Sequence, residues 1–252
     1  MKLFLTCFSV VTVLALSGCG GSDSESSIDL DAKVLYKTAA EYDLKDYVAP
    51  SENTLKTYRE LTYVNNDGKK SFKGDPDEEI TVEKYDINGN TIIVKDKNDA
   101  IDEIYIIKTD RIENKDDLND TTPDELARYV DIGDYVFVDN QSTDFSNQIP
   151  IQGKTACKVT KHYATKELNK VDYNDVLKIE CQVVANGETT ANGILIKYSY
   201  DVTEESYHAK GLGEVYSESI SCQDVKTTIN KQTTTNATCE KETTSLISAN
   251  KI

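Results

Sequence analysis

The chain has 252 residues with 44 acidic and 28 basic side chains, which gives a formal net charge of −16 at pH 7. This balance excludes the usual electrostatic attraction to nucleic acid or to anionic lipid head groups, so we expect no nucleic acid among its partners. Fifteen tyrosines, no tryptophan and an apolar fraction of 38% favour antiparallel strands with one solvated face over a buried parallel sheet.

The first 19 residues have the composition of an export signal. Lys2 is followed by an apolar run, Leu3 to Leu16, and by small residues before Cys19. The run is shorter than the roughly 20 residues that a spanning helix needs. Leu16-Ser17-Gly18-Cys19 resembles a bacterial lipobox, in which the cysteine thiol is diacylated and the chain is cut just before it. The resemblance implies that residues 1–18 are a lipoprotein signal peptide and that lipidated Cys19 anchors the protein to a membrane.

The residues after Cys19 bear on where the protein is anchored and how. In enteric bacteria, an aspartate directly after the lipidated cysteine resembles an inner-membrane retention signal. Gly20 stands there instead, so the resemblance favours the outer membrane and leaves the periplasmic or surface face open. Residues 19–45 begin with a low-complexity acidic stretch and are predicted to form a flexible tether. The β domain is predicted over 46–252, either undivided or in two halves, 46–140 and 141–252.

From about residue 47, apolar and polar residues alternate with the period of strands. Asn88-Gly89 stands between two such runs and predicts a hairpin. One short helix is predicted near 123–130, because Thr122 can cap it, Pro123 suits its first position and Glu125 completes a capping box. About ten strands and one helix predict an all-β, mainly antiparallel protein, built as a curved sheet, a sandwich or a partly open barrel.

Four cysteines remain when Cys7 leaves with the signal and Cys19 is lipidated: Cys157, Cys181, Cys222 and Cys239. An even number in an exported chain indicates disulfides, with three possible connectivities. The first two are equidistant from Asn169, and the last two are centred between Asn230 and Lys231. Both centres are plausible hairpin tips, so we predict the pairs 157–181 and 222–239. The pair 181–222 remains the alternative.

A second resemblance covers residues 149–221. Ile149-Pro150-Ile151-Gln152-Gly153 leads into one amphipathic strand, and Tyr207-His-Ala-Lys-Gly-Leu-Gly-Glu-Val215 leads into another. The two segments look like the Val-Pro-Ala-Gly and Tyr-x-Ala-x-Gly-x-Gly-x-Val segments of periplasmic β-rich lipoproteins, some of which resemble the half-barrel folds of lipoprotein carriers. Gln152-Gly153-Lys154 departs from the first pattern. The resemblance implies a fold rather than an activity. Independently, Gly211 and Gly213 favour positive φ or a bulge at a strand entry.

No catalytic pattern stands out in the chain, so we predict no enzymatic activity and no cofactor. Gly-x-Ser-x-Gly is absent, and carboxylates are too numerous for one pair to be singled out. His162 and His208 are the only histidines, and they lack the short spacing of a metal site. The candidate ligands for calcium are oxygen-bearing side chains close in sequence, namely Asp96, Asn98, Asp99 and Asp102.

These observations predict a non-catalytic binding or scaffold module of the cell envelope, whose partner is an envelope protein or an apolar ligand. A carrier of lipids or lipoproteins with an apolar cavity is the first alternative. A hydrolase or metal-dependent enzyme is the second. The lining of any internal cavity, and the positions of the two histidines, distinguish the three.

Overall fold

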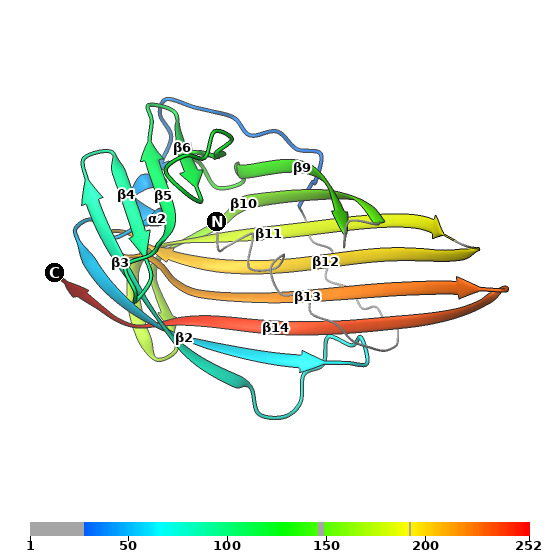
Figure 1. The fold of residues 1–252 in the computed structure, drawn as a ribbon. Helices are drawn as coiled ribbons and strands as arrows, with labels where there is room; N and C mark the ends of the chain where they lie inside the picture. Colours follow the sequence, from blue (N-terminus) through cyan, green and yellow to red (C-terminus); the bar gives the residue numbers. More distant parts are fainter. Residues whose placement is uncertain (1–27, 146–148, 192) are drawn as a thin grey trace.

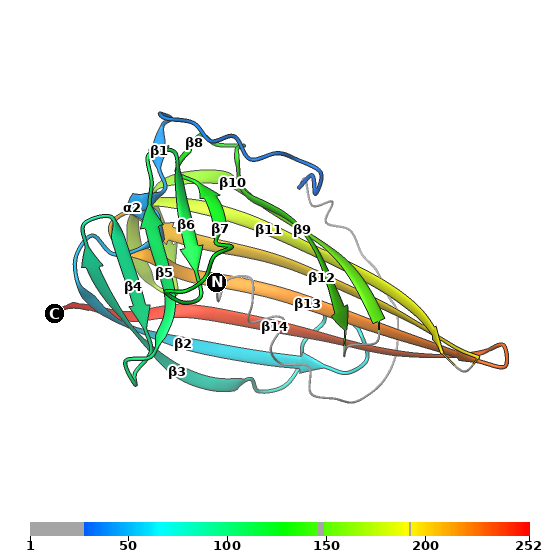
Figure 2. The same ribbon diagram turned by 45° about the horizontal axis from the view of Figure 1, so that its top comes forward.

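A twelve-stranded antiparallel sheet contains most of the chain that the computed structural model describes, which is residues 28–145, 149–191 and 193–252. Its strand order is β7-β6-β5-β4-β3-β2-β14-β13-β12-β11-β10-β9. The two edge strands, β7 and β9, approach each other, so the sheet curves into a nearly closed, barrel-like body (Figure 2). The predicted all-β, mainly antiparallel fold is therefore confirmed.

Most strands of the second half of the chain are longer than those of the first half (Figure 1). To this sheet the first half contributes β2 (Thr54–Asn65), β3 (Asp77–Asn88), β4 (Thr91–Lys95), β5 (Ile101–Ile107), β6 (Arg111–Lys115) and β7 (Asp124–Ala127). The second half contributes β9 (Tyr135–Phe145), β10 (Ile149–Leu168), β11 (Val171–Ala191), β12 (Ile194–Ala209), β13 (Gly213–Ile229) and β14 (Gln232–Lys251). Because β14 pairs with β2, the sheet runs without interruption across the predicted halves, 46–140 and 141–252.

The hairpins have the tips that the sequence indicates. Asn169 and Lys170 connect β10 to β11, and Asn230 and Lys231 connect β13 to β14. Both residues of each tip have positive φ, 50° and 68°, as a two-residue type I′ turn requires. The register then places Cys157 opposite Cys181, and Cys222 opposite Cys239, and the structure contains both predicted disulfides.

The helix predicted near 123–130 is wrong. This segment forms the edge strand β7 and, after a break, the short strand β8 (Tyr129–Val130). Leu126 pairs with Ile112 of β6, and Leu126, Ala127 and Val130 are buried. A helix of two turns is marginal by itself, whereas the edge of β6 offers unpaired backbone groups together with apolar contacts. The capping residues are therefore overridden by pairing with a neighbouring strand.

The predicted end of the tether at residue 45 lies too far along the chain. Strand β1 (Tyr42–Asp43) pairs with β8, and Tyr42 and Leu44 are buried. Upstream, the Lys37 ammonium lies 2.9 Å from a carboxylate oxygen of Asp131, and the backbone N–H of Asp29 donates to the Tyr135 hydroxyl. Residues 28–45 therefore belong to the domain. The rest of the predicted tether, 19–27, the signal peptide and Cys19 lie outside the described residues.

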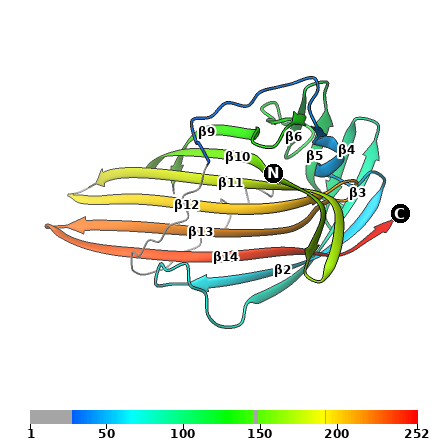
Figure 3. The same cartoon turned by 180° about the vertical axis from the view of Figure 1, so that it is seen from behind.

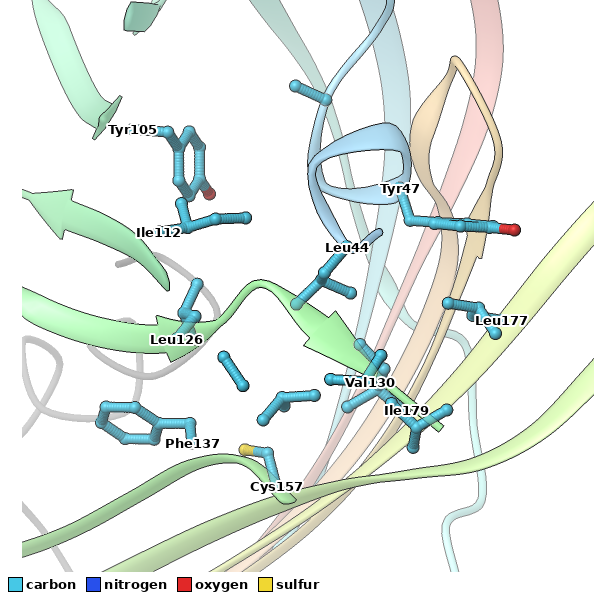
Figure 4. Close-up of a cluster of buried hydrophobic side chains, with 14 of the residues drawn as sticks. Leu44, Tyr47, Tyr105, Ile112, Leu126, Val130, Phe137, Cys157, Leu177 and Ile179 are labelled. Carbon is cyan, nitrogen blue, oxygen red and sulfur yellow. The ribbon is translucent and has the colours of Figure 1, made fainter. Parts of the chain in front are cut away.

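The helix of the described chain, α2 (Lys45–Val48), lies where none was predicted. It packs at one end of the barrel, against the turn between β12 and β13 (Figure 3). The backbone N–H of Gly211 donates to the Asp46 carbonyl at 2.7 Å. Figure 4 shows Leu44 and Tyr47 directed towards side chains of β8 and β11 in the main apolar core. Within the described residues, no helix combines the length and hydropathy that crossing a bilayer requires.

Candidate functional site

A partly open cavity of about 400 Å³ lies on the inner side of the curved sheet, next to α2. Part of its lining is apolar and consists of Leu44, Val48, Leu126, Val136, Ile179 and the disulfide between Cys157 and Cys181. The other part, here called the acidic wall, consists of seven glutamates: Glu60, Glu79, Glu83, Glu103, Glu204, Glu214 and Glu242. Three tyrosines, Tyr58, Tyr85 and Tyr105, also line the cavity.

The acidic wall follows from strand geometry, because side chains two residues apart point to the same face of a sheet. In β2, Lys56, Tyr58 and Glu60 share the inner face. In the register with β3, Lys56 is opposite Glu83 and Glu60 is opposite Glu79. Glu60, Glu83, Glu103 and Glu204 each lie two residues from a buried side chain of their own strand. On the other strands the register places Glu214 opposite His208, and Ser219 between Glu204 and Glu242, so the curvature of the sheet brings the seven glutamates around one space.

Lys56 is a fully buried basic side chain beside the acidic wall, with 0% of its surface exposed. Its ammonium group donates to the backbone carbonyl of Glu214 at 2.7 Å and lies 4.7 Å from the centre of the Tyr58 ring. Burial lowers the pKa of Lys56, and the charges of Glu83 and Glu214 oppose this shift. Lys56 therefore compensates a small part of the negative charge of the wall.

Three carboxyl groups on β12, β13 and β14 repel one another. Burial raises the pKa of Glu204 well above its usual value, and the charges of Glu214 and Glu242 raise it further. Burial also raises the pKa of Glu214 and of Glu242. The Ser217 hydroxyl donates to one carboxylate oxygen of Glu214 at 2.8 Å, while the other oxygen is buried without a partner among the described residues. These groups are held together at an electrostatic cost.

Hydroxyl groups satisfy several glutamates on the other strands. The Tyr85 hydroxyl donates to Glu83 at 2.7 Å, and the Thr81 hydroxyl donates to Glu60 at 2.7 Å. The Tyr105 hydroxyl donates to Glu103. Burial raises the pKa of Tyr85 and of Tyr105 well above the usual value, so both remain protonated donors.

Asn114 on β6 is the buried amide of this lining. Only 3% of its surface is exposed, and its strand register places it beside Tyr105. Neither its Nδ2 nor its Oδ1 has a hydrogen-bond partner within the described residues. A buried amide left without partners costs about 1–3 kcal/mol, so a polar side chain in this position calls for a partner inside the cavity.

His208 closes the lining next to α2. It is 5% exposed, its Nδ1 lies 3.3 Å from the Tyr47 carbonyl and its Nε2 lies 3.0 Å from the Ser206 hydroxyl. Burial, with a further contribution from the charge of Lys56, lowers the pKa of His208 to about 4. The imidazole is therefore neutral at pH 7, and Nδ1–H donates to the carbonyl.

As the pH falls from about 6.5 to 4, the His208→Gln variant should lose less of its free energy of unfolding than the wild type does. A histidine whose pKa is lowered by folding takes up a proton more readily in the unfolded chain, so stability is lost as the pH falls through this window. The shift corresponds to about 3 kcal/mol at full extent. Urea unfolding at several pH values measures the difference between wild type and variant. His162→Gln is the control; an equal effect in both variants would contradict the assignment.

The residues considered for metal binding do not assemble. His162 pairs with Asp175 at 2.9 Å, while His208 faces the cavity. The calcium candidates Asp96, Asn98, Asp99 and Asp102 lie at or near the turn between β4 and β5, where one Asp96 carboxylate oxygen accepts the backbone N–H of Asn98 at 2.7 Å and that of Ala100 at 2.9 Å. Across the described chain, no three His, Cys, Asp or Glu side chains are placed to hold a metal ion.

The cavity differs from the apolar one that was considered for a lipid carrier. Glutamates make up a large share of its lining, and placing hydrocarbon against them would desolvate carboxyl groups without compensation. The sequence analysis missed the wall altogether. The sequence of two strands did indicate it. Lys56 and Glu60 in β2, and Glu204 and His208 in β12, occupy alternate positions that face inwards, where a sheet with one solvated face normally has apolar residues.

Comparisons with known proteins add little. No protein-family model matches the chain, and no curated protein matches it. Among solved structures, it is similar to a candidate exported protein with a YmcC-like fold from Bacteroides fragilis NCTC 9343, at 8% identity and a TM-score of 0.36, over 81% of this chain and 99% of that one. It is also similar to outer-membrane expressed OmpT of Vibrio cholerae, at 6% identity and a TM-score of 0.18, over 79% and 99%. Likenesses at these scores support no functional conclusion.

Proposed function

We propose that the protein is a lipid-anchored, non-catalytic lipoprotein of the bacterial cell envelope, and that its β domain binds a small molecule in the cavity beside α2. The observation that supports binding most directly is the cavity of about 400 Å³ with the buried amide of Asn114 in its lining, for which the described residues offer no hydrogen-bond partner. A volume of this size suits a small ligand, and pockets that combine apolar and convergent polar groups are the usual sites for one.

The envelope location is supported by two independent features. The Leu16-Ser17-Gly18-Cys19 segment resembles a lipobox, and both disulfides suit an oxidising compartment outside the cytoplasm. Because residues 28–45 pack on the domain, only residues 19–27 separate the lipid from the folded body. Nine residues span at most about 30 Å when fully extended, so the domain stays close to the membrane surface.

The anchor is tested by expressing the full chain in a bacterium and measuring the mass of the mature N-terminal peptide. We expect the chain to begin at Cys19, to carry diacylglycerol and to sediment with membranes. Cys19→Ala should abolish acylation and leave the precursor unprocessed. A wild-type chain that starts at another residue with a free amine would overturn the anchor.

The binding function is tested by native mass spectrometry of the lipoprotein in detergent. We expect a bound small molecule on the wild type and its loss from Ser219→Trp, because Ser219 lines the cavity and the indole would occupy part of it. Thr233→Trp, at the exposed start of β14, is the matched control and should retain the molecule. A wild-type protein that carries nothing and behaves like Ser219→Trp towards every added compound would overturn the proposal.

A further inference from the structure

The geometry points to a small amphipathic organic cation of the amine class as the occupant of the cavity. Its ammonium group would lie on the acidic wall, and its apolar body against Leu44, Val48 and Ile179. The inference rests on the proposed function, because it names the chemistry of a ligand that the cavity must first be able to hold.

The first argument for a cationic ligand is the excess of acidic side chains around the cavity. Seven glutamates line the cavity, and in residues 28–145, 149–191 and 193–252 Lys56 is the buried basic side chain beside them. His208 is neutral because burial lowers its pKa to about 4. A concave, partly enclosed space lined by so many carboxyl groups attracts a cation, because charges interact more strongly where part of the water is displaced.

The carboxyl groups of Glu204 and Glu242 are the ones best placed to receive it. Within the described part of the chain, neither accepts a hydrogen bond or forms an ion pair, in contrast to Glu60 and Glu83, which accept bonds from Thr81 and Tyr85. Burial and neighbouring negative charge raise the pKa of both groups. An ammonium group would relieve this repulsion and supply the missing donors.

Asn114 is an independent observation that also indicates a ligand. Its amide is 3% exposed, lines the cavity and has no partner for either polar atom among the described residues. It lies on β6, on a strand remote in the sheet from β12 and β14. A ligand with a polar group in the same space would satisfy the amide, which a purely structural acidic cluster would not need.

An organic cation fits the lining better than a metal ion does. No three potential metal ligands are placed together in the described chain, whereas a metal ion requires several oxygen atoms around one point. The apolar part of the lining would also remain in contact with water if a hydrated ion were bound, whereas the apolar body of an organic cation would bury it. The ring of Tyr105 also lines the cavity and can contact an ammonium group, whereas the rings of Tyr58 and Tyr85 already lie beside the Lys56 ammonium.

Three compounds that share a phenylbutyl group and differ in their polar head group test the inference. The purified full-length lipoprotein in detergent is titrated calorimetrically at pH 7.5 with 4-phenylbutylamine, 4-phenylbutanol and 4-phenylbutyrate, and with calcium chloride alone. We expect the amine to bind about tenfold or more tightly than the alcohol, since a charge-assisted hydrogen bond contributes that much, and we expect the acid not to bind.

Glu204→Gln/Glu242→Gln is the test variant, and it should weaken binding of the amine by about tenfold to a hundredfold. The same variant should raise the unfolding midpoint of the free protein, because it removes repelling carboxylates. Glu78→Gln/Glu188→Gln is the matched control: it removes the same formal charge from exposed positions that do not line the cavity, and it should leave amine affinity unchanged. A structural role alone would change the midpoint without changing affinity.

Asn114→Leu provides a second test if the double variant does not fold. Leucine has a similar volume and no polar atoms, so the free protein should unfold at a higher temperature while amine affinity falls several-fold. Equal binding of the amine and the alcohol, binding of calcium alone, or no binding by any compound would each overturn the inference. A neutral or anionic molecule found on the wild type by native mass spectrometry would then leave the proposed function standing.

Discussion

Replacing Lys56 by methionine should lower the free energy of unfolding by about 1–3 kcal/mol at pH 7, because the Glu214 carbonyl loses a hydrogen bond from a charged donor. The burial that lowers the pKa of Lys56 offsets the remaining loss. Methionine fills a similar space, so the change removes the ammonium group with little loss of packing. Glu83 and Glu214 then face each other without the intervening cation, and the Glu214 carbonyl loses the donor at 2.7 Å. Urea unfolding followed by circular dichroism measures the effect.

The loss of unfolding free energy in Lys56→Met should depend on pH. Without the ammonium charge, the pKa of Glu214, already raised by burial, rises further in the folded state. A carboxyl group whose pKa is raised by folding contributes stability below its ordinary pKa, and that contribution is lost as the pH rises through the folded value. The variant should therefore approach the wild type near pH 4.5 and fall behind it towards pH 8.

Lys84→Met is the matched control for this prediction. Lys84 lies on β3, where its ammonium group is 3.2 Å from Asp99 and about a third of its side chain is exposed. Loss of such a surface pair costs about 0–1 kcal/mol. Equal destabilisation by the two variants would show that the charge inside the barrel is not what Lys56 compensates.

Gly213→Ala should destabilise the domain by about 2–5 kcal/mol, because two costs add at this position. Gly213 has φ of +77°, a region that is strained for a residue with a Cβ atom. An added Cβ would also lie 3.0 Å from the Cα of Ala49 and 3.1 Å from the carbonyl oxygen of Val48. Both contacts are with backbone, so α2 would have to move away from the turn between β12 and β13.

Gly211→Ala separates the two costs. Gly211 has nearly the same φ, +72°, but a Cβ there would meet only the Ser51 side chain, at 3.6 Å or more. Its destabilisation should be about 1–2 kcal/mol, from backbone strain alone. Because α2 bounds the cavity with Val48, Gly213→Ala should also reduce ligand affinity, while Gly211→Ala should not. Thermal unfolding and the amine titration distinguish these outcomes.

The segment 123–130, predicted as a helix, shows the limit of sequence rules that consider only a few neighbouring residues. Thr122, Pro123 and Glu125 satisfy the requirements of a helix start, and each acts within a few residues. The strand that forms instead depends on β6 and on the buried positions of Leu126 and Val130. Backbone pairing and burial over a distance outweigh a cap that contributes about 1 kcal/mol.

The acidic wall could be anticipated only in part. The period of β2 and β3 places Lys56, Glu60, Glu79 and Glu83 on inner-face positions once the pairing register is known. Glu204, Glu214 and Glu242 come from strands near the end of the chain. They join the others because β14 pairs with β2 and the sheet curves, and a single sequence contains no rule for that pairing.

The sequence by itself determined what acts within a hairpin or along one strand: the alternation of strands, the two-residue tips at Asn169 and Asn230, and two disulfides symmetric about those tips. Only the tertiary structure decided which strands close the barrel, which carboxyl groups line the cavity, and that the Asn114 amide is buried there without a partner among the described residues. The reason is physical. Turn preferences and side-chain period depend on neighbours a few residues away, whereas burial, pKa and cavity shape depend on groups that meet only when the sheet closes.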